Sequence, residues 1–236
     1  LIEGWARIPT EVEAASEFRY RNPIITPTTL VVAVSQSGET ADTLAAIRDA
    51  RIKGAKVFGI TNVVGSPVAR ESDGVIYTKA NKEIAVASTK SFIGQVVSLT
   101  LLALLLAQVK YRLTTKQTRM MFRELSDTAE QIQWILDTQD EAVHEAALLC
   151  KDAQSALFVG RGMGAAISYE GALKLKEVSY LHAEAYAAGE MKHGPIALID
   201  PGFPVIAVAT KSATYDKTVS NLMECKARGA KVIVVA

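Results

Sequence analysis

Cysteine and histidine, the residues that most often hold metals or form disulfides, are scarce in this 236-residue sequence. The two cysteines, Cys150 and Cys225, lie in helical patterns and lack the spacing of metal ligands. We therefore predict no metal site and no disulfide, and infer a reduced compartment. Together with the lack of a signal-peptide pattern at Leu1, this predicts a cytoplasmic protein.

Excess charge and a nucleotide-binding fingerprint are also missing. The formal net charge is +1 and no basic stripe appears, which argues against a nucleic-acid partner. The segment RGMGAA, which begins at Arg161, follows an apolar run but lacks the third glycine of a dinucleotide-binding turn. We therefore predict that the chain uses no cofactor.

Only one apolar run, Phe92–Val109, is long enough to raise the question of a membrane. Gln95, Ser98, Thr100 and Gln108 interrupt it and leave an apolar core too short to cross a bilayer. We expect a buried helix here and no contact with a membrane.

The sequence contains two copies of one unit. Leu30–Val57 aligns without a gap on Val205–Val232, with LVVAVSQSGE over VIAVATKSAT and KGAKV over RGAKV. The second copy opens with the apolar run Ser155–Gly160, whereas the first copy begins partway along the equivalent helix. The chain starts at Leu1 rather than methionine and stops within an apolar pattern. We therefore expect a fragment whose first copy lacks an opening strand and its loop.

The turn SQSGET, residues 35–40, is the most informative segment. It follows the β-branched run LVVAV, typical of a buried parallel strand, and opens an amphipathic helix whose free N–H groups attract anions. Side chains that can hydrogen-bond an anion gather in this turn: Ser35, Gln36, Ser37 and Thr40. Gly38 lets a ligand approach the backbone. With no lysine or arginine, the turn fits a small monophosphate better than a nucleotide. The alternative is that Ser37 only caps the helix.

Strands and helices alternate along the chain. We predict strands at 30–35, 56–61, 74–78, 155–160, 204–210 and 231–236. We predict helices at 40–53, 88–110, 165–181 and 214–228, with two further helical patterns at 114–138 and 139–152. Such alternation is typical of α/β folds with doubly wound parallel sheets, whose ligands bind at the carboxyl ends of the strands. The predicted division is a first domain at 1–113, linking helices at 114–146 and a second domain at 147–236.

Three charged residues share one face of the helix after RGMG. Glu170, Lys174 and Glu177 stand at positions i, i+4 and i+7. A carboxylate poised near neutral pH is suited to moving a proton between adjacent carbons. The same spacing describes an exposed ladder of ion pairs, which is its commoner use, so spacing alone leaves both interpretations open.

Two loops contribute further candidates. His193 lies in the turn KHGP, and its imidazole can give and take a proton near pH 7, although a loop histidine with no such role is the alternative. Val86, Ala87 and Ser88 precede the long apolar helix, where Ser88 or Thr89 could serve only as an N-cap.

SQSGET, EIAVASTKSF, the two α/β copies and the segment EGALKLKEVSYLHAEAYAAGEMKHGPIALID resemble the glutamine–fructose-6-phosphate aminotransferase family. The resemblance runs along the whole chain and covers the half of that family built from two tandem sugar isomerase (SIS) domains. It implies that fructose 6-phosphate and ammonia become glucosamine 6-phosphate. The ammonia would come from glutamine, hydrolysed in a separate N-terminal glutaminase domain.

The resemblance also implies roles for individual residues. Glu177 matches the family's proton-transfer base, Lys174 the lysine that assists at the C1 hydroxyl, and Glu170 a polar residue of the site. His193 matches the histidine that opens the sugar ring and reaches into the partner subunit's site, which implies a homodimer. The loop Val86–Ser88 would close over the sugar phosphate.

The two copies differ where this chemistry would lie. In the repeat alignment, Ser35–Gly38 becomes Thr210–Ala213, so the second turn has lost its glycine, while Gly4 stands where the second copy has Glu177. We therefore expect the first copy to bind the phosphate and the second to supply the chemistry. The family's opening loop with its ligand serine and its C-terminal lysine lie outside the chain, so the chain alone is expected to bind sugar phosphate weakly and to be inactive.

Two other classes of function remain open. One is a sugar-phosphate isomerase or deglycase that uses no glutamine, which could carry similar carboxylate and histidine chemistry. The other is a non-enzymatic SIS module that senses a sugar phosphate, which would keep SQSGET but would not need the Glu170–Glu177 face.

Overall fold

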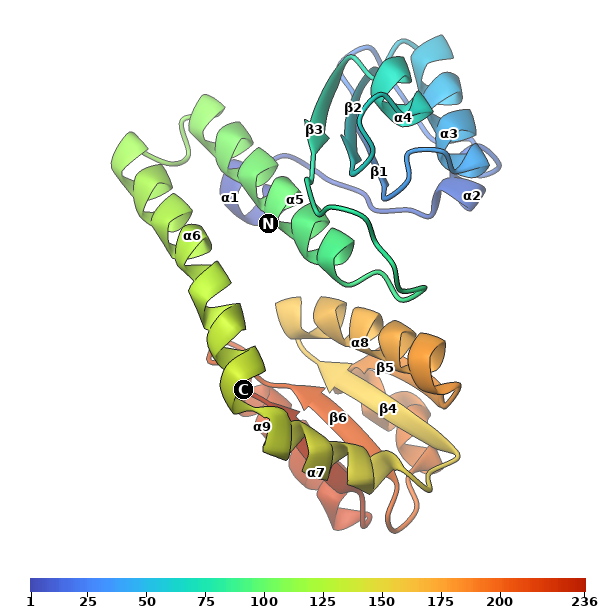
Figure 1. Ribbon diagram of the computed structural model, residues 1–236, viewed down its shortest axis with the longest axis vertical. Helices are drawn as coiled ribbons and strands as arrows, with labels where there is room; N and C mark the ends of the chain where they lie inside the picture. Colours follow the sequence, from blue (N-terminus) through green and yellow to red (C-terminus); the bar gives the residue numbers. More distant parts are fainter. The chain divides into compact units, whose positions relative to one another are not determined.

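The computed structural model describes residues 1–236 and divides into two compact units, Leu1–Gln131 and Ile132–Ala236. Each unit contains one fully parallel sheet (Figure 1). The strand order is β1-β2-β3 in the first unit and β5-β4-β6-β7 in the second. Parallel sheets with helical crossovers confirm the predicted α/β class.

The first unit contains three strands and both helices predicted for the first copy, at 40–53 and 88–110. Its strands are β1 (Leu30–Ser35), β2 (Lys56–Thr61) and β3 (Gly74–Tyr77). Its helices are α1 (Ile2–Ala6), α2 (Ala15–Phe18), α3 (Ala41–Ile52), α4 (Pro67–Glu71) and α5 (Lys90–Val109). Helix α6 (Thr115–Thr138) begins in this unit and ends in the next.

The register of the first sheet aligns the carboxyl ends of its strands. Ser35 at the end of β1 pairs with Thr61 at the end of β2, and Thr61 pairs with Tyr77 of β3. Helix α3 packs on β1 and β2, and its buried Ile47 joins Val57 of β2 in the core. The turn that follows β1 is therefore held at the carboxyl edge of the sheet, where ligands bind in such folds.

Helix α5 differs from the buried helix that the sequence predicts. It packs against α1 and buries Leu102, Leu104 and Ala107, but Leu105 and Val109 are exposed. Helix α5 is long and apolar enough to cross a membrane, so its polar residues do not exclude a membrane span, contrary to the expectation from the sequence. Core helices of soluble proteins meet the same criteria of length and composition. Only the structure shows which side of α5 is buried, because the sequence of an almost uniformly apolar helix carries no pattern that distinguishes its faces.

The second unit contains four strands. They are β4 (Ser155–Gly160), β5 (His182–Ala187), β6 (Pro204–Val208) and β7 (Lys231–Val235). Its helices are α7 (Asp140–Cys150), α8 (Met163–Ser179) and α9 (Tyr215–Ala227), with the short 3-10 helices η1 (Ala188–His193) and η2 (Pro195–Leu198). Helix α8 packs on β4 and β5 (Figure 1).

The core of the second unit lies between its central strands and η1 and α9. Leu157 and Val159 of β4, Val205 of β6 and Met191 of η1 are almost completely buried in one cluster with Leu222 of α9. Removing apolar area of this kind from water contributes roughly 25 cal/mol per Å² to folding. Since η1 is part of this core, the position of His193 at its end is set by packing.

The internal repeat is visible in the elements. Strands β1 and β2 correspond to β6 and β7, and helix α3 corresponds to α9. Strand β5, which the sequence did not predict, pairs with β4, whereas the equivalent segment of the first copy, residues 9–14, forms no strand. The first unit contains no counterpart of β4 beside which that segment could pair.

Candidate active site

The SQSGET turn connects β1 to α3 and is organised by its own hydroxyl groups. The buried Oγ of Ser35 accepts the N–H of Gly38 at 3.0 Å and lies 3.3 Å from Thr40 Oγ1. The Oγ of Ser37 accepts the N–H of Glu39 at 3.2 Å. Ser37 uses only a lone pair here, so its O–H remains a donor for a bound anion. In the Ser35–Thr40 pair one hydroxyl donates to the other, which leaves one O–H of the two as a donor.

The structure does not support the interpretation of Ser37 as a helix cap. The N-cap of α3 is Thr40, and no side chain makes a capping hydrogen bond to the first turn of the helix. The first N–H groups of α3 therefore lack side-chain partners, and these groups and the positive end of the helix dipole attract an anion. The hydroxyls and the uncapped helix favour the predicted phosphate site at residues 35–40.

Position 38 requires glycine because of its backbone conformation and because of the side chains packed against it. Its φ of +68° lies in the left-handed region. A Cβ on Gly38 would lie 2.2 Å from Oγ and 2.6 Å from Cβ of Ser66, and 2.8 Å from Oγ1 of Thr61. Its carbonyl accepts the N–H of Val68 at 3.0 Å, which ties the turn to α4.

We expect Gly38→Ala to destabilise the first unit, by about 1–3 kcal/mol for overpacking and about 1–2 kcal/mol for the left-handed backbone. Denaturant unfolding measures this change. Gly65→Ala is the matched control, since Gly65 also has a positive φ of 71° but no atom within 4 Å of its Cβ position. In a Ser66→Gly background the cost of Gly38→Ala should fall, and an unchanged cost would show that Ser66 is not the source of the clash.

The loop that contains Val86, Ala87 and Ser88 enters helix α5. Val86 is exposed and Ala87 is buried. Thr89 occupies the N-cap position of α5, but neither it nor Ser88 makes a side-chain capping hydrogen bond. The sequence-based alternative of a simple N-cap is therefore not supported for these two residues.

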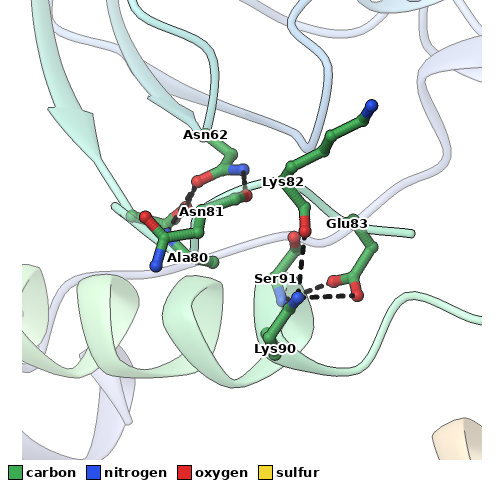
Figure 2. A network of polar contacts seen from close by, with 8 residues as sticks. Asn62, Ala80, Asn81, Lys82, Glu83, Lys90 and Ser91 are labelled. Carbon is green, nitrogen blue, oxygen red and sulfur yellow. Dashed lines mark hydrogen bonds and ion pairs between the residues drawn. The ribbon is translucent and has the colours of Figure 1, made fainter. Parts of the chain in front are cut away.

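The capping function belongs instead to Glu83, which the sequence analysis did not identify. Its carboxylate accepts the N–H of Ser91 at 3.0 Å and lies 3.8 Å from Lys90 Nζ (Figure 2). The hydrogen bond from the Ser91 backbone lowers the pKa of the Glu83 carboxyl, and it outweighs the opposite effect of burial. No local motif reveals this contact, because Glu83 lies seven residues before the first residue of α5.

In the second unit, α8 brings together the three predicted charged residues. Lys174 Nζ lies 2.5 Å from Oε2 of Glu177 and 3.4 Å from Oε1 of Glu170. The exposed fractions of the three side chains are 24% for Lys174, 28% for Glu177 and 23% for Glu170. They are therefore mostly covered, unlike a fully solvated ladder of surface charges.

Electrostatics keep Lys174 protonated. Burial by itself lowers the pKa of Lys174, but the pairs with Glu177 and Glu170 act more strongly, and the net direction is upward. The lysine therefore remains an ammonium group at neutral pH and can donate hydrogen bonds. Its ion pairs with Glu170 and Glu177 hold both carboxylates close to this donor.

His193 is exposed at the end of η1 and belongs to the second unit. Gly194, which follows it, has a φ of 143° and separates η1 from η2. His193 makes no hydrogen bond with Lys174 or Glu177, and its role in ring opening stays a prediction.

The equivalent turn of the second copy has a different structure. The N–H of Thr214 donates to Ser212 Oγ at 3.3 Å, and Thr214 is the N-cap of α9. Ala213, the counterpart of Gly38, has no positive φ. The second turn thus lacks the left-handed residue on which the first turn depends.

The comparisons with known proteins define the class of protein. Residues 1–105 and 149–236 match the family described as SIS domain, and the chain therefore belongs to the SIS domain family. Glutamine–fructose-6-phosphate aminotransferases from Chlorobaculum tepidum and Clostridium tetani are each 52% identical to the chain over all of its length. The chain spans 38% of the length of either relative.

Solved structures agree with this relationship. The C-terminal domain of glucosamine-fructose-6-phosphate aminotransferase from Francisella tularensis superposes with a TM-score of 0.96 at 44% identity, covering 99% of this chain and 66% of that one. Glucosamine-6-phosphate deaminase from Thermotoga maritima superposes with a TM-score of 0.78 at 26% identity, covering 100% of this chain and 69% of that one. The resemblance deduced from SQSGET and the α8 segment is confirmed.

Proposed function

We propose that the chain is the sugar-isomerising part of an enzyme that converts fructose 6-phosphate and glutamine-derived ammonia to glucosamine 6-phosphate. The paired carboxylates and lysine on α8 are the structural observation that carries the proposal, because a purely phosphate-sensing module has no need for them. The whole-length identity to aminotransferases that carry this name supports the choice of substrate.

The proposed chemistry assigns a different task to each unit. In the first unit, Ser35, Gln36, Ser37 and Thr40 bind the phosphate group through hydroxyl, amide and helix N–H donors. Ammonia condenses with the C2 carbonyl of the open-chain sugar and releases water. Glu177 then accepts a proton from C1 and returns it to C2. The C1 hydroxyl loses its proton and the imine nitrogen gains one, which leaves an aldehyde at C1 and an amine at C2.

The remaining residues assist these steps. Lys174, kept protonated by its carboxylate partners, hydrogen-bonds the C1 oxygen, and Glu170 contributes to sugar binding. His193 opens the sugar ring, and its exposure at the end of η1 is compatible with a role in the site of a partner subunit. The loop Val86–Ser88 closes over the sugar phosphate. No metal or organic cofactor is required for any of these steps.

The proposal extends to partners and location. We propose that the full-length protein is a homodimer whose N-terminal glutaminase domain supplies ammonia to the SIS domains. The names of the relatives include glutamine as a substrate, which supports such a domain. Both cysteines of this chain are free thiols, which fits a cytoplasmic enzyme.

A second candidate is a deaminase or isomerase that uses no glutamine, favoured by the structural similarity to the Thermotoga maritima deaminase. The two candidates share the chemistry at C1 and C2 and differ in whether nitrogen is transferred and in where it comes from. The carboxylates of α8 therefore do not separate them, whereas an assay with defined nitrogen donors does.

We expect the full-length protein to form glucosamine 6-phosphate from fructose 6-phosphate when glutamine is supplied. Product formation is measured by mass spectrometry, with ammonium chloride in place of glutamine as the parallel reaction. Product from ammonium but not from glutamine would assign the chain to the glutamine-independent class. Sugar phosphate that is bound but neither aminated with either donor nor isomerised would identify a sensing module.

A further inference from the structure

Asn62 lies between the two segments of the first unit that the proposed function assigns to substrate binding. It is the residue after β2, and its backbone N–H donates to the carbonyl of Gln36 in the SQSGET turn at 3.0 Å. Thr61, the preceding residue, also donates its hydroxyl to the Gln36 carbonyl, at 3.4 Å. The end of β2 therefore supports the SQSGET turn through a single carbonyl group.

The side chain of Asn62 holds the chain that leads to the second substrate-binding segment. Its Oδ1 accepts the hydroxyl of Thr78 at 3.0 Å and the N–H of Ala80 at 2.8 Å. Its Nδ2 donates to the carbonyl of Asn81 at 2.6 Å (Figure 2). One amide side chain thus makes three hydrogen bonds to residues 78–81, close to its full capacity of four.

Residues 78–81 need such support because their backbone is strained. Lys79 and Asn81 adopt positive φ angles of 52° and 57°, which are uncommon for residues other than glycine. Conformations of this kind persist only where surrounding contacts impose them. The contacts from Asn62 lie on either side of Lys79 and on Asn81 itself, so they favour this path of the chain over more extended alternatives.

The same path continues into the loop that contains Val86–Ser88. Immediately after Asn81, the carbonyl of Lys82 accepts Lys90 Nζ at 2.9 Å, and the carboxylate of Glu83 accepts the Ser91 N–H (Figure 2). The loop is therefore closed by contacts between its two ends. Asn62 holds residues 80 and 81, which lead directly into this loop. Figure 2 shows the contacts of Asn62 followed along the chain by those of Lys82 and Glu83.

We infer that Asn62 is a positioning residue, which holds the SQSGET turn and the Val86–Ser88 loop in one relative arrangement. The inference rests on the proposed function, because both segments are assigned there to the sugar phosphate. Asn62 touches neither the substrate nor the reacting atoms in this account. Its effect is to keep the binding-competent arrangement highly populated, and a lower population of that arrangement weakens apparent affinity in proportion.

The test uses the full-length protein and compares kinetics with stability. Asn62→Ala should raise the KM for fructose 6-phosphate about tenfold or more, with kcat changed about twofold or less, because the catalytic groups of α8 are untouched. Asn62→Asp guards against loss of folding, since it keeps the size and the acceptor for Thr78 and Ala80. It places an oxygen against the Asn81 carbonyl, so its KM should also rise.

Asp73→Asn is the matched structural control. Asp73 precedes β3, and its carboxylate accepts the N–H of Val57 at 2.8 Å, near the amino end of β2 and away from the SQSGET turn. The variant should lower the melting temperature and leave the KM unchanged. If Asp73→Asn raised the KM as much as the Asn62 variants, Asn62 would have only a general structural role.

The outcomes separate this inference from the proposed function. If the wild-type protein forms no glucosamine 6-phosphate, the proposed function is wrong, and so is the inference that rests on it. If the wild type is active and both Asn62 variants keep its KM, the inference alone is overturned. A fall in kcat at unchanged KM would also overturn it, since positioning of the phosphate-binding segments predicts the opposite pattern.

Discussion

Glu177→Gln in the full-length protein should reduce the turnover of fructose 6-phosphate by roughly 10²- to 10⁴-fold, the usual contribution of a general base. Glutamine keeps the shape of the side chain but cannot accept a proton at neutral pH. The KM should change little, because the phosphate is assigned to the SQSGET turn. Steady-state formation of glucosamine 6-phosphate at saturating sugar phosphate measures the effect.

Glu71→Gln provides a matched control for Glu177→Gln. Glu71 also has a side-chain exposure of 28% and pairs with a cation, Arg48, at 2.6 Å, but it lies on α4 of the first unit. The control should keep wild-type turnover although it loses an ion pair. Wild-type turnover in Glu177→Gln as well would mean that Glu177 is a structural partner of Lys174 and not the base.

Replacing Ser37 and Thr40 by alanine should each raise the KM for fructose 6-phosphate by about tenfold to 150-fold. The range follows from a loss of about 1.5–3 kcal/mol for a hydrogen bond to a charged group. Stability should change much less, because the only hydrogen bond of Ser37 in the turn is to the exposed Glu39 N–H. Initial rates over a series of sugar-phosphate concentrations give the KM.

The repeat supplies the control for this second experiment. Ser212 and Thr214 stand in the corresponding turn of the second unit, and alanine at either position should leave the KM unchanged. Equal effects in both turns would contradict the assignment of phosphate binding to the first unit. An unchanged KM in the Ser37 and Thr40 variants would show that the SQSGET turn is not the phosphate-binding site.

The strands of both sheets follow closely from the sequence. The predicted bounds of β1, β2 and β4 are those of the structure, because each is a short run rich in β-branched or apolar residues and ends at a glycine or a polar turn. Strand β5, HAEAYA, was missed because its small and charged residues do not resemble a buried strand. It is a strand only because β4 lies beside it.

The face of α8 that carries Glu170, Lys174 and Glu177 was likewise predictable, since helical spacing alone places these residues together. Their partial burial was not predictable from the spacing, which also describes exposed ion pairs. Coverage depends on which elements pack near the helix, and those elements are distant in the sequence.

The sequence by itself determined the α/β class, the two-copy organisation, the SQSGET turn and the membership in the SIS domain family. These features depend on residues that are close in the chain or on motifs that repeat. The tertiary structure alone decided that Glu83 caps α5, that Ser66 packs beneath Gly38 and that Asn62 joins two loops. Each of these contacts spans eight to 28 residues and depends on the three-dimensional path of the chain. In the case of Asn62 this path runs through left-handed residues at positions 79 and 81. Local propensity carries no signal for such contacts, because the same asparagine or glutamate would be ordinary in any exposed loop.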